Sequence, residues 1–364
     1  MNKIKVFLAR KGVVCSFRQY GVDALGAMAQ GLFCTLLVGT ILNTLGQQLH
    51  IGFLTAPVVS VGTVSYTVGG LASAMVGPGI AVAIGTALHC PPLVLFSLIP
   101  VGFAANAMGG AGGPLAVYAV TIIAAELGKL VSKETRIDIL VTPCVTVIAG
   151  IAVAQLIAAP IGTAARAVGL AIMWATELQP FFMGVLVSAL IGIALTLPIS
   201  SAAICAAFGL TGLAGGAAVA GCCAQMVGFA VMSFKENRWG GLVAQGVGTS
   251  MLQMPNILKN PRIWIPPTLA SMITGPLATC VFKLQMNGSP VSSGMGTCGF
   301  VGQIGVYTGW VSDIAAGTKA AITPMDWIGL VLICFILPAV LSMFFCRVLE
   351  KRGWIREGDM KLDL

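Results

Sequence analysis

Two long stretches without charge constrain the fold of this chain more than any other feature. No Asp, Glu, Lys or Arg lies between Asp23 and Glu126, and none lies between Glu177 and Lys235. A helix of about 20 apolar residues crosses the hydrocarbon core of a bilayer, so each stretch is long enough for several crossings. The apolar residues run continuously and do not alternate with polar ones, which favours helices over a β-barrel. The sequence therefore predicts an all-α integral membrane protein.

The composition agrees with this interpretation. Charged residues make up 9% of the chain and apolar residues 57%, whereas soluble domains carry roughly 25% charged residues. We expect about ten transmembrane helices, each of about 20 residues, and one or two re-entrant hairpins. Prolines and glycines set several expected boundaries. Four expected spans that depend on them are 91–113, 114–127, 139–159 and 160–174.

The formal net charge of +8 comes largely from basic residues near the two ends. Lys and Arg that flank membrane spans mark the cytoplasmic side, so we expect both termini in the cytoplasm. Nucleic acid binding by the basic N-terminus is the alternative, and the presence of basic residues at both ends disfavours it. Membrane lipid is the expected partner. We divide the chain into a cytoplasmic amphipathic segment at 1–20, one membrane domain at 21–347 and a cytoplasmic basic tail at 348–364.

No pattern for catalysis or for a bound metal stands out. The 11 cysteines include no CxxC pair, and His50 and His89 are far apart in the sequence, so we expect no metal and no cofactor. The Gly-rich stretch at 294–303 lacks the GK[ST] ending of a phosphate-binding loop. We therefore assign no catalytic residue.

The segment 248–261 is the strongest candidate for a binding site. It combines hydroxyls, two kinds of amide and a cation with Pro255 and Pro261, which interrupt a regular helix and free backbone carbonyls. Amides and hydroxyls both donate and accept hydrogen bonds, which suits a neutral, polyhydroxylated ligand. We interpret the segment as the tip of a re-entrant hairpin, and a polar loop outside the membrane is the alternative. Its candidate substrate-binding residues are Thr249, Ser250, Gln253, Asn256 and Lys259.

Three further polar residues lie within or beside apolar runs. Glu177 is the single acidic residue between Asp138 and Glu236, and it is a functional carboxylate, an interfacial residue at a helix end or a structural partner of Arg166. Ser200 follows a proline break, where a hydroxyl either lines a site or bonds back to a freed carbonyl. Gln303 ends the Gly-rich stretch at 294–303, a candidate second re-entrant segment. All three are candidate substrate-binding residues.

Three stretches carry a resemblance to a known family. They are PFFMGVLVSALIGIALTLPISSAA at 180–203, NRWGGLVAQGVGTSMLQMPNILKNPRIWIPPTLASMITGPLATCVF at 237–282, and GMGTCGFVGQ at 294–303. They resemble the membrane-embedded IIC subunits of the bacterial phosphoenolpyruvate-dependent sugar phosphotransferase system. More narrowly, they resemble the stand-alone branch that includes the regulator of perfringolysin production. The resemblance extends over nearly the whole chain.

The resemblance implies an IIC-like fold and a homodimer in the bacterial cytoplasmic membrane. It also implies two re-entrant hairpins that hold a sugar or sugar derivative near the middle of the membrane. The sugar would move inward by alternating access and be phosphorylated by a separate IIB protein, itself served by IIA. The chain would thus be, at most, the membrane subunit of a sugar phosphotransferase, with no phosphotransfer residue of its own.

Two departures keep other functions open. Sugar-binding IIC subunits use a Glu and a His at the sugar hydroxyls; Glu177 matches by its position before a proline, but neither His50 nor His89 lies in a matching motif. No IIA or IIB domain is fused to the chain. The alternatives are a membrane sensor that regulates without transport, and an ion-coupled carrier of organic anions that uses Arg166 or Lys259.

Overall fold

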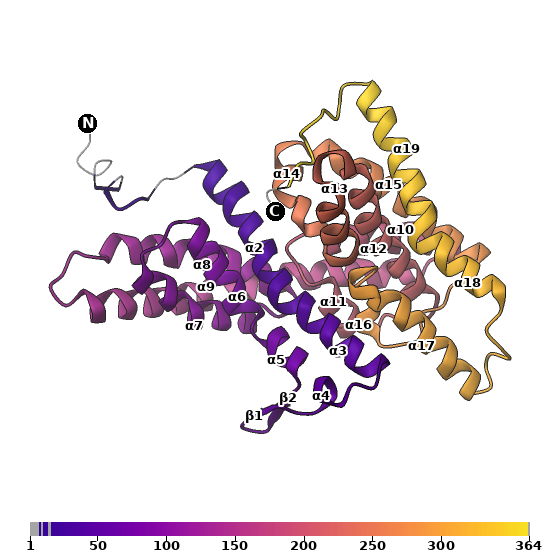
Figure 1. Ribbon diagram of the computed structural model, residues 1–364, viewed down its shortest axis with the longest axis horizontal. Helices are drawn as coiled ribbons and strands as arrows, with labels where there is room; N and C mark the ends of the chain where they lie inside the picture. Colours follow the sequence, from indigo (N-terminus) through magenta and orange to yellow (C-terminus); the bar gives the residue numbers. More distant parts are fainter. Residues whose placement is uncertain (1–6, 9, 14–15, 363–364) are drawn as a thin grey trace. The chain divides into compact units, whose positions relative to one another are not determined.

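The structure is a computed structural model that describes residues 7–8, 10–13 and 16–362. It divides within its longest helix into two compact units, Met1–Ala164 and Ala165–Leu364. Helices dominate both units (Figure 1). The strands of the described part are β1 (Val59–Val61) and β2 (Val64–Tyr66), which form one short antiparallel hairpin. The all-α prediction is confirmed.

Unit 1 begins with a continuous apolar helical stretch, 18–48, in which α-helical and π-helical turns alternate. A bend of 54° separates α5 from α6, so this pair is either a broken span or a re-entrant loop. The helices of unit 1 are α2 (Leu25–Leu32), α3 (Val38–Gln48), α4 (Gly52–Thr55), α5 (Val68–Ala74), α6 (Val76–Ala87), α7 (Pro92–Gly109), α8 (Gly113–Val131) and the first part of α9 (Asp138–Thr176).

A glycine run turns α7 back onto α8. Gly110 has φ +52°, a conformation that glycine adopts without steric cost. Close contacts then pair the two helices in antiparallel order, because Gly113 lies against Asn106 and Gly128 lies against Val94. The predicted boundary at 109–113 is therefore confirmed.

The predicted break at Pro160 is wrong. A single helix, α9, runs for 39 residues and includes both Pro143 and Pro160. Proline removes one backbone hydrogen bond, but a membrane helix tolerates this loss where neighbouring groups compensate. At about 1.5 Å per residue α9 is about 58 Å long, well beyond the thickness of a hydrocarbon core of about 30 Å.

Unit 2 is built around α12 (Gly212–Met232), which packs against α10 (Pro180–Thr196), α15 (Ile265–Pro276) and α19 (Leu337–Lys351). Two irregular segments interrupt its helices, one between α13 and α15 and one between α15 and α17. The remaining helices are α11 (Ser201–Ala207), α13 (Phe234–Val243), α14 (Met254–Lys259), α16 (Pro290–Ser293), α17 (Val301–Ala315) and α18 (Pro324–Val331), and the short turns are Ala244–Gly248, Ser250–Gln253, Pro261–Trp264, Leu277–Val281, Cys298–Phe300 and Leu332–Ile336.

Glycine allows α12 and α15 to approach α10 closely. A Cβ atom on Gly221 of α12 would overlap the carbonyl oxygen of Ser188 in α10, and one on Gly275 of α15 would overlap that of Gly184, also in α10. Small residues at such contacts let membrane helices pack backbone against backbone. The hydroxyl of Ser188 also donates to the carbonyl of Ser271, at 2.7 Å, which ties α10 to α15.

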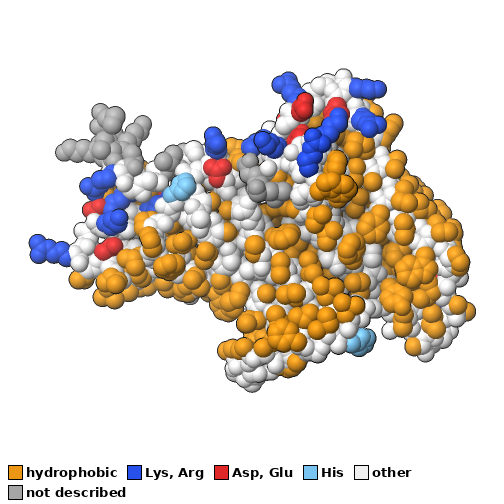
Figure 2. All heavy atoms as spheres, in the orientation of Figure 1, with side chains coloured by type: hydrophobic (Ala, Val, Ile, Leu, Met, Phe, Trp, Pro, Cys, Tyr) orange, Lys and Arg blue, Asp and Glu red, His pale blue; other side chains and the backbone are white. Residues whose placement is uncertain are grey.

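The surface is that of a membrane protein. Large apolar side chains are exposed along α9, where Ile148 is 69% and Leu156 is 74% exposed, and hydrophobic side chains cover much of the face in Figure 2. Within the described residues, five helical stretches are long and apolar enough to cross a membrane, or six if the bent pair α5–α6 counts as one span. The structure thus confirms a multi-pass helical protein, while the number ten is not confirmed.

The described part of the N-terminus is tied to the loop between α8 and α9. Arg10 and Lys11 both pair with Glu134, and the Lys129 ammonium donates to the carbonyl of Gly12. The basic residues of 7–20 and this charged loop therefore share one end of unit 1. The division at 1–20, 21–347 and 348–364 and the cytoplasmic location of both termini remain predictions; residues 1–6, 9 and 14–15 of the first segment lie outside the described residues.

The contacts of Glu134 predict a pH dependence. The Lys11 hydrogen bond, aided by the charge of Arg10, holds the pKa of Glu134 below its ordinary value of 4.5. A carboxyl group whose pKa is lower in the folded protein than in the unfolded chain stabilises the folded protein at pH values above its unfolded pKa. This stabilisation is lost as the pH falls through the folded pKa. Thermal unfolding in detergent should show Glu134→Gln melting below wild type at pH 7, with the gap narrowing as the pH falls below 4.5. A gap that stays constant as the pH falls would contradict this origin, and Glu357→Gln serves as the charge-matched control.

The glycine contacts predict a second effect. Gly221→Ala and Gly275→Ala should each destabilise unit 2 by about 1–3 kcal/mol, because the new methyl group meets backbone that has no room to yield. Gly240→Ala is the control, since a Cβ there meets nothing within 4 Å. Melting temperatures of the three variants in detergent provide the measurement. Equal stability of all three would show that the helices separate easily at these positions.

Candidate functional site

The predicted hairpin at 248–261 is buried in unit 2. Ser250 and Gln253 are fully buried, and Asn256 is 5% exposed. Local side chains satisfy part of the irregular backbone, because the Thr249 hydroxyl accepts from the N–H of Met251 and Asn260 accepts from that of Arg262. The segment is therefore enclosed by protein, and its assignment as a re-entrant hairpin remains a prediction.

Ser250 joins a polar network centred on Gln225 of α12. The Gln225 carbonyl accepts from the Trp264 indole at 3.0 Å and from the Thr196 hydroxyl at 3.3 Å, and its amide donates to Thr268 at 3.1 Å. The hydroxyls of Thr196 and Ser250 lie 2.8 Å apart. This central network contains no charged side chain and connects α10, α12, α15 and the hairpin.

Sequence reasoning missed Gln225. A usable signal was present, since Gln225 is the one amide in the otherwise small and apolar run of α12. Its partners lie 29, 39 and 43 residues away, and no spacing rule connects positions so far apart. Only the packing of α10 and α15 against α12 brings them together.

A row of amides continues from the central network toward the C-terminal end of the chain. Gln245 donates to the Ser233 hydroxyl and accepts from Gln253, and Gln253 in turn accepts from Asn256. Each of these bonds is 2.8–2.9 Å long. The hairpin thus presents amides over its whole length.

The C-terminal tail binds to this row of amides. Gln253 donates to the carbonyl of Met360 at 2.9 Å, and Asn256 donates to that of Lys361 at 2.8 Å. Asn237 both donates to Met360 and accepts from the N–H of Leu362. In Figure 1 the tail runs from the end of α19 toward α14, and Met360 is buried.

Two more anchors hold the tail, which we define as residues 354–362. Glu236 accepts from the N–H groups of Gly358 and Met360, and Asn260 donates to the carbonyl of Trp354. Side chains of α13 and of the hairpin therefore bind the tail mainly through its backbone. From the sequence this segment is described only as part of a basic tail. Hydrogen bonds to backbone groups cannot be predicted from residue types, because every residue has a backbone carbonyl.

The second irregular segment lies beside the first, and both pack against α12. The turns 244–248 and 298–300 pack against each other. Ser201 donates to the carbonyl of Gly294 at 2.7 Å, so it satisfies that segment and does not bond back within its own helix. Gln303 donates to the Cys223 thiol, and its Oε1 atom is buried without a partner in the described residues.

The structure brings some of the eight candidate residues together and leaves others apart. Gln253 and Asn256 bond to each other, Ser250 bonds to Thr196 of the central network, and Thr249 accepts from the N–H of Met251. Ser200 accepts from the N–H of Ala203 and so begins α11, while Gln303 belongs to the second segment. Two candidates, Glu177 and Lys259, are exposed, and their side chains form no ion pair or hydrogen bond with the described residues; Arg166 is likewise exposed.

Hydroxyl and amide groups without formal charge are suited to binding a neutral ligand with many hydroxyls. Among the described residues, no group of three or more His, Cys, Asp or Glu side chains is placed to hold a metal ion. The site residues named from the sequence remain predictions, and the structure places Gln225, Thr196 and Gln245 among the buried polar groups bonded beside them.

The tail contacts yield a prediction. Asn237→Ala removes two hydrogen bonds to the tail, each contributing about 1 kcal/mol, so the tail should open roughly ten times more often or more. Limited trypsin digestion at Arg356 and Lys361 measures this opening. Asn106→Ala in α7 is the control, because its side chain makes no hydrogen bond with the described residues. Equal digestion rates for wild type and Asn237→Ala would show that the tail is held by other contacts.

The comparisons with known proteins bear on the whole chain. A search of curated proteins and a search of solved structures each found no match. A comparison with protein-family models matches residues 22–362 to the family described as Phosphotransferase system, EIIC. This range includes both irregular segments, the central network and the whole of the tail. The resemblance noted in the sequence is thereby confirmed at the level of the family, and the chain belongs to the phosphotransferase system EIIC family.

Proposed function

We propose that this EIIC-family membrane subunit is a permease for a sugar or sugar derivative, which it moves inward by alternating access. In this proposal a separate IIB protein, served by IIA, phosphorylates the sugar, and the chain works as a homodimer in the bacterial cytoplasmic membrane. Family membership supports a permease-type membrane subunit. The substrate class, the coupling and the dimer are the proposed part.

The central network carries the proposal. Gln225, Thr196 and Ser250 place donors and acceptors inside an apolar bundle, and no charged group joins them. Burying polar groups is unfavourable unless each group forms hydrogen bonds. A buried polar network in an apolar bundle therefore indicates a functional role. Exchanging these bonds for bonds to sugar hydroxyls keeps every group satisfied.

The same observation disfavours an organic-anion carrier. A buried carboxylate or phosphate needs a cation close by. Arg166 and Lys259, the two cations considered for that role, are both exposed, and neither bonds to the central network. A neutral substrate therefore fits the described site better.

The proposed sugar contacts are Thr249, Ser250, Gln253 and Asn256 from the hairpin, with Gln303 from the second segment. The unpartnered Oε1 atom of Gln303 supports its inclusion, because it is an acceptor without a donor. Ser200, Glu177 and Lys259 join the site only in a conformation that moves them toward it, since Ser200 is engaged in capping α11 and the other two are exposed.

Uptake into membrane vesicles tests the proposal. Ser250→Ala and Asn256→Ala should each lower the uptake of a labelled sugar at least tenfold, the effect of losing about 1.4 kcal/mol of binding. Thr163→Ala is the control, because its exposed hydroxyl bonds only within its own helix. Full uptake by both hairpin variants would contradict the site. Competition by sugar acids but not by sugars would move the assignment to the anion carrier.

One observation favours a second candidate function, that of a membrane sensor. Gln253 and Asn256 use their amide groups to bind the tail. A sugar that takes those amides would displace the tail and expose it to a cytoplasmic protein. Ligand binding at the hairpin would then be converted into a signal without transport.

Deleting residues 354–364 separates the two functions. For a sensor, the truncated chain should keep or improve sugar binding and lose its regulatory effect on gene expression. For a permease, it should retain uptake. Sugar should also accelerate trypsin cleavage of the tail in the full chain if the tail reports on ligand binding. Unchanged cleavage with sugar bound would rule out this sensor mechanism.

A further inference from the structure

A polar cavity of about 460 Å³ lies in unit 2, away from the central network and the tail. Its walls are the segment 283–287, the C-terminal end of α17, the loop that follows α17 and the first turn of α18. Pockets for small molecules have volumes of about 300–1,000 Å³, so the cavity has the size for a monosaccharide or a disaccharide. No candidate from the sequence lies there.

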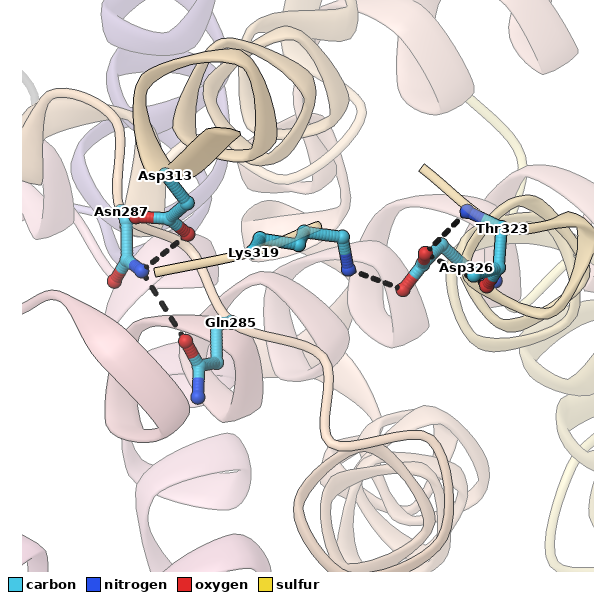
Figure 3. A network of polar contacts seen from close by, with 6 residues as sticks. All are labelled: Gln285, Asn287, Asp313, Lys319, Thr323 and Asp326. Atoms are coloured by element: carbon cyan, nitrogen blue, oxygen red, sulfur yellow. Dashed lines mark hydrogen bonds and ion pairs between the residues drawn. The ribbon is translucent and has the colours of Figure 1, made fainter. Parts of the chain in front are cut away.

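Hydrogen bonds hold the cavity walls in place, and one of them joins residues 26 positions apart. Asn287 donates to Asp313 of α17 at 2.8 Å and to Gln285 at 3.2 Å, and Lys319 donates to Asp326 of α18 at 2.8 Å (Figure 3). Asp326 also completes a capping box with Thr323 at the start of α18. These polar groups are therefore positioned before any ligand arrives, which lowers the entropic cost of binding.

The same side chains keep unused hydrogen-bonding capacity. Asp313 Oδ1, Asn287 Oδ1 and Gln285 Nε2 make no hydrogen bond with the described residues, and Lys319 uses one of its three N–H groups. Asn287, Asp313 and Lys319 are partly buried. The cavity thus offers both donors and acceptors, as a ligand with several hydroxyls requires.

The charges around the cavity cancel. Lys283 and Lys319 supply two positive charges, and Asp313 and Asp326 supply two negative charges. An anionic ligand would approach the carboxylates, and a cationic ligand would approach the ammonium groups. A neutral ligand is repelled by neither pair of charges, so the charge balance favours a neutral polyhydroxylated compound.

The cavity and the tail lie at opposite ends of one helical stretch. Pro324–Lys351 is a 28-residue apolar span that starts at the cavity wall and ends just before the tail. At about 1.5 Å per residue the span is about 42 Å long, enough to cross a membrane. The cavity therefore opens on the membrane side opposite to the tail and to the amides that the tail covers.

We propose that this cavity is a second sugar site, which captures a neutral sugar on the membrane side opposite to the C-terminal tail. The cavity residues are separate from those of the hairpin. The inference rests on the proposed function for one point, that the captured compound is the compound transported. The binding itself is a property of the cavity residues.

Equilibrium binding to the purified full-length protein in nanodiscs tests the site. The probes are labelled glucose, N-acetylglucosamine and mannitol, with gluconate as the charged competitor. We expect at least one neutral probe to bind, Asp313→Asn and Gln285→Ala each to weaken its binding about tenfold, and gluconate not to compete. Gln285 is exposed, so its variant tests the site even if Asp313→Asn fails to fold. Glu357→Gln, which removes a carboxylate from the exposed part of the tail, should bind as wild type does.

Labelling locates the bound sugar. Thr318 lines the cavity, so Thr318→Cys should react with a membrane-impermeant maleimide in proteoliposomes, with the wild-type chain as the blank for its native cysteines. The neutral probe should slow this reaction, and Lys361→Cys should react only from the opposite side. Reaction of both cysteines from one side would overturn the proposal.

The outcomes separate this inference from the proposed function. Failure of all three neutral probes to bind, or equal binding by wild type, Asp313→Asn and Gln285→Ala, overturns the capture site, whatever uptake shows. Uptake that is lost in Ser250→Ala but has an unchanged KM in Gln285→Ala supports the permease and overturns the capture site. Probe binding that depends on Gln285, together with no uptake by wild type, supports the site and overturns the permease.

Discussion

The close contact of α12 with α10 is the constraint on which unit 2 depends. Gly221 removes the side chain that would otherwise hold the two helices apart, and its backbone lies against that of Ser188. Gln225 follows four residues later and so lies on the same face of α12. The contact therefore brings the amide of Gln225 within reach of Thr196, and through Thr196 it fixes Ser250 at the tip of the hairpin. The polar network exists because the helices pack backbone against backbone.

Irregular backbone inside an apolar bundle must find its hydrogen bonds within the protein. The two irregular segments of unit 2 do so mainly through short polar side chains, such as Thr249 and Ser201. The tail contributes in the same way, since its carbonyls complete the hydrogen bonding of Gln253 and Asn256. These interactions explain how a segment with two prolines remains ordered without forming a regular helix.

The polar features of unit 2 are arranged along a path. The capture cavity lies at one end of the last span, the central network lies in the body of α12, and the tail covers the amides at the other end. In a permease these three places correspond to entry, occlusion and release, and in a sensor they correspond to detection and output. Both functions use the same neutral donors and acceptors, which is why the choice between them depends on what the tail does when sugar binds.

The sequence by itself determined the membrane class, because long uncharged stretches admit no other stable setting. It also determined the helix ends that depend on one residue type, such as the glycine run after α7. It failed at Pro160, because whether a proline breaks a helix depends on neighbours that the sequence does not reveal. The hairpin at 248–261 was found because its composition is unusual for an apolar region.

Only the tertiary structure decided how these polar groups are used. The partners of Gln253 and Asn256 lie 107 and 105 residues away, and their acceptors are backbone carbonyls, which every residue possesses. The capture cavity likewise joins side chains from four separate segments, none of which is distinctive alone. The physical reason is that the composition of a segment determines whether it is stable in water or in a membrane. Hydrogen bonds form between groups that lie close together, and groups distant in the sequence come close only when the helices pack.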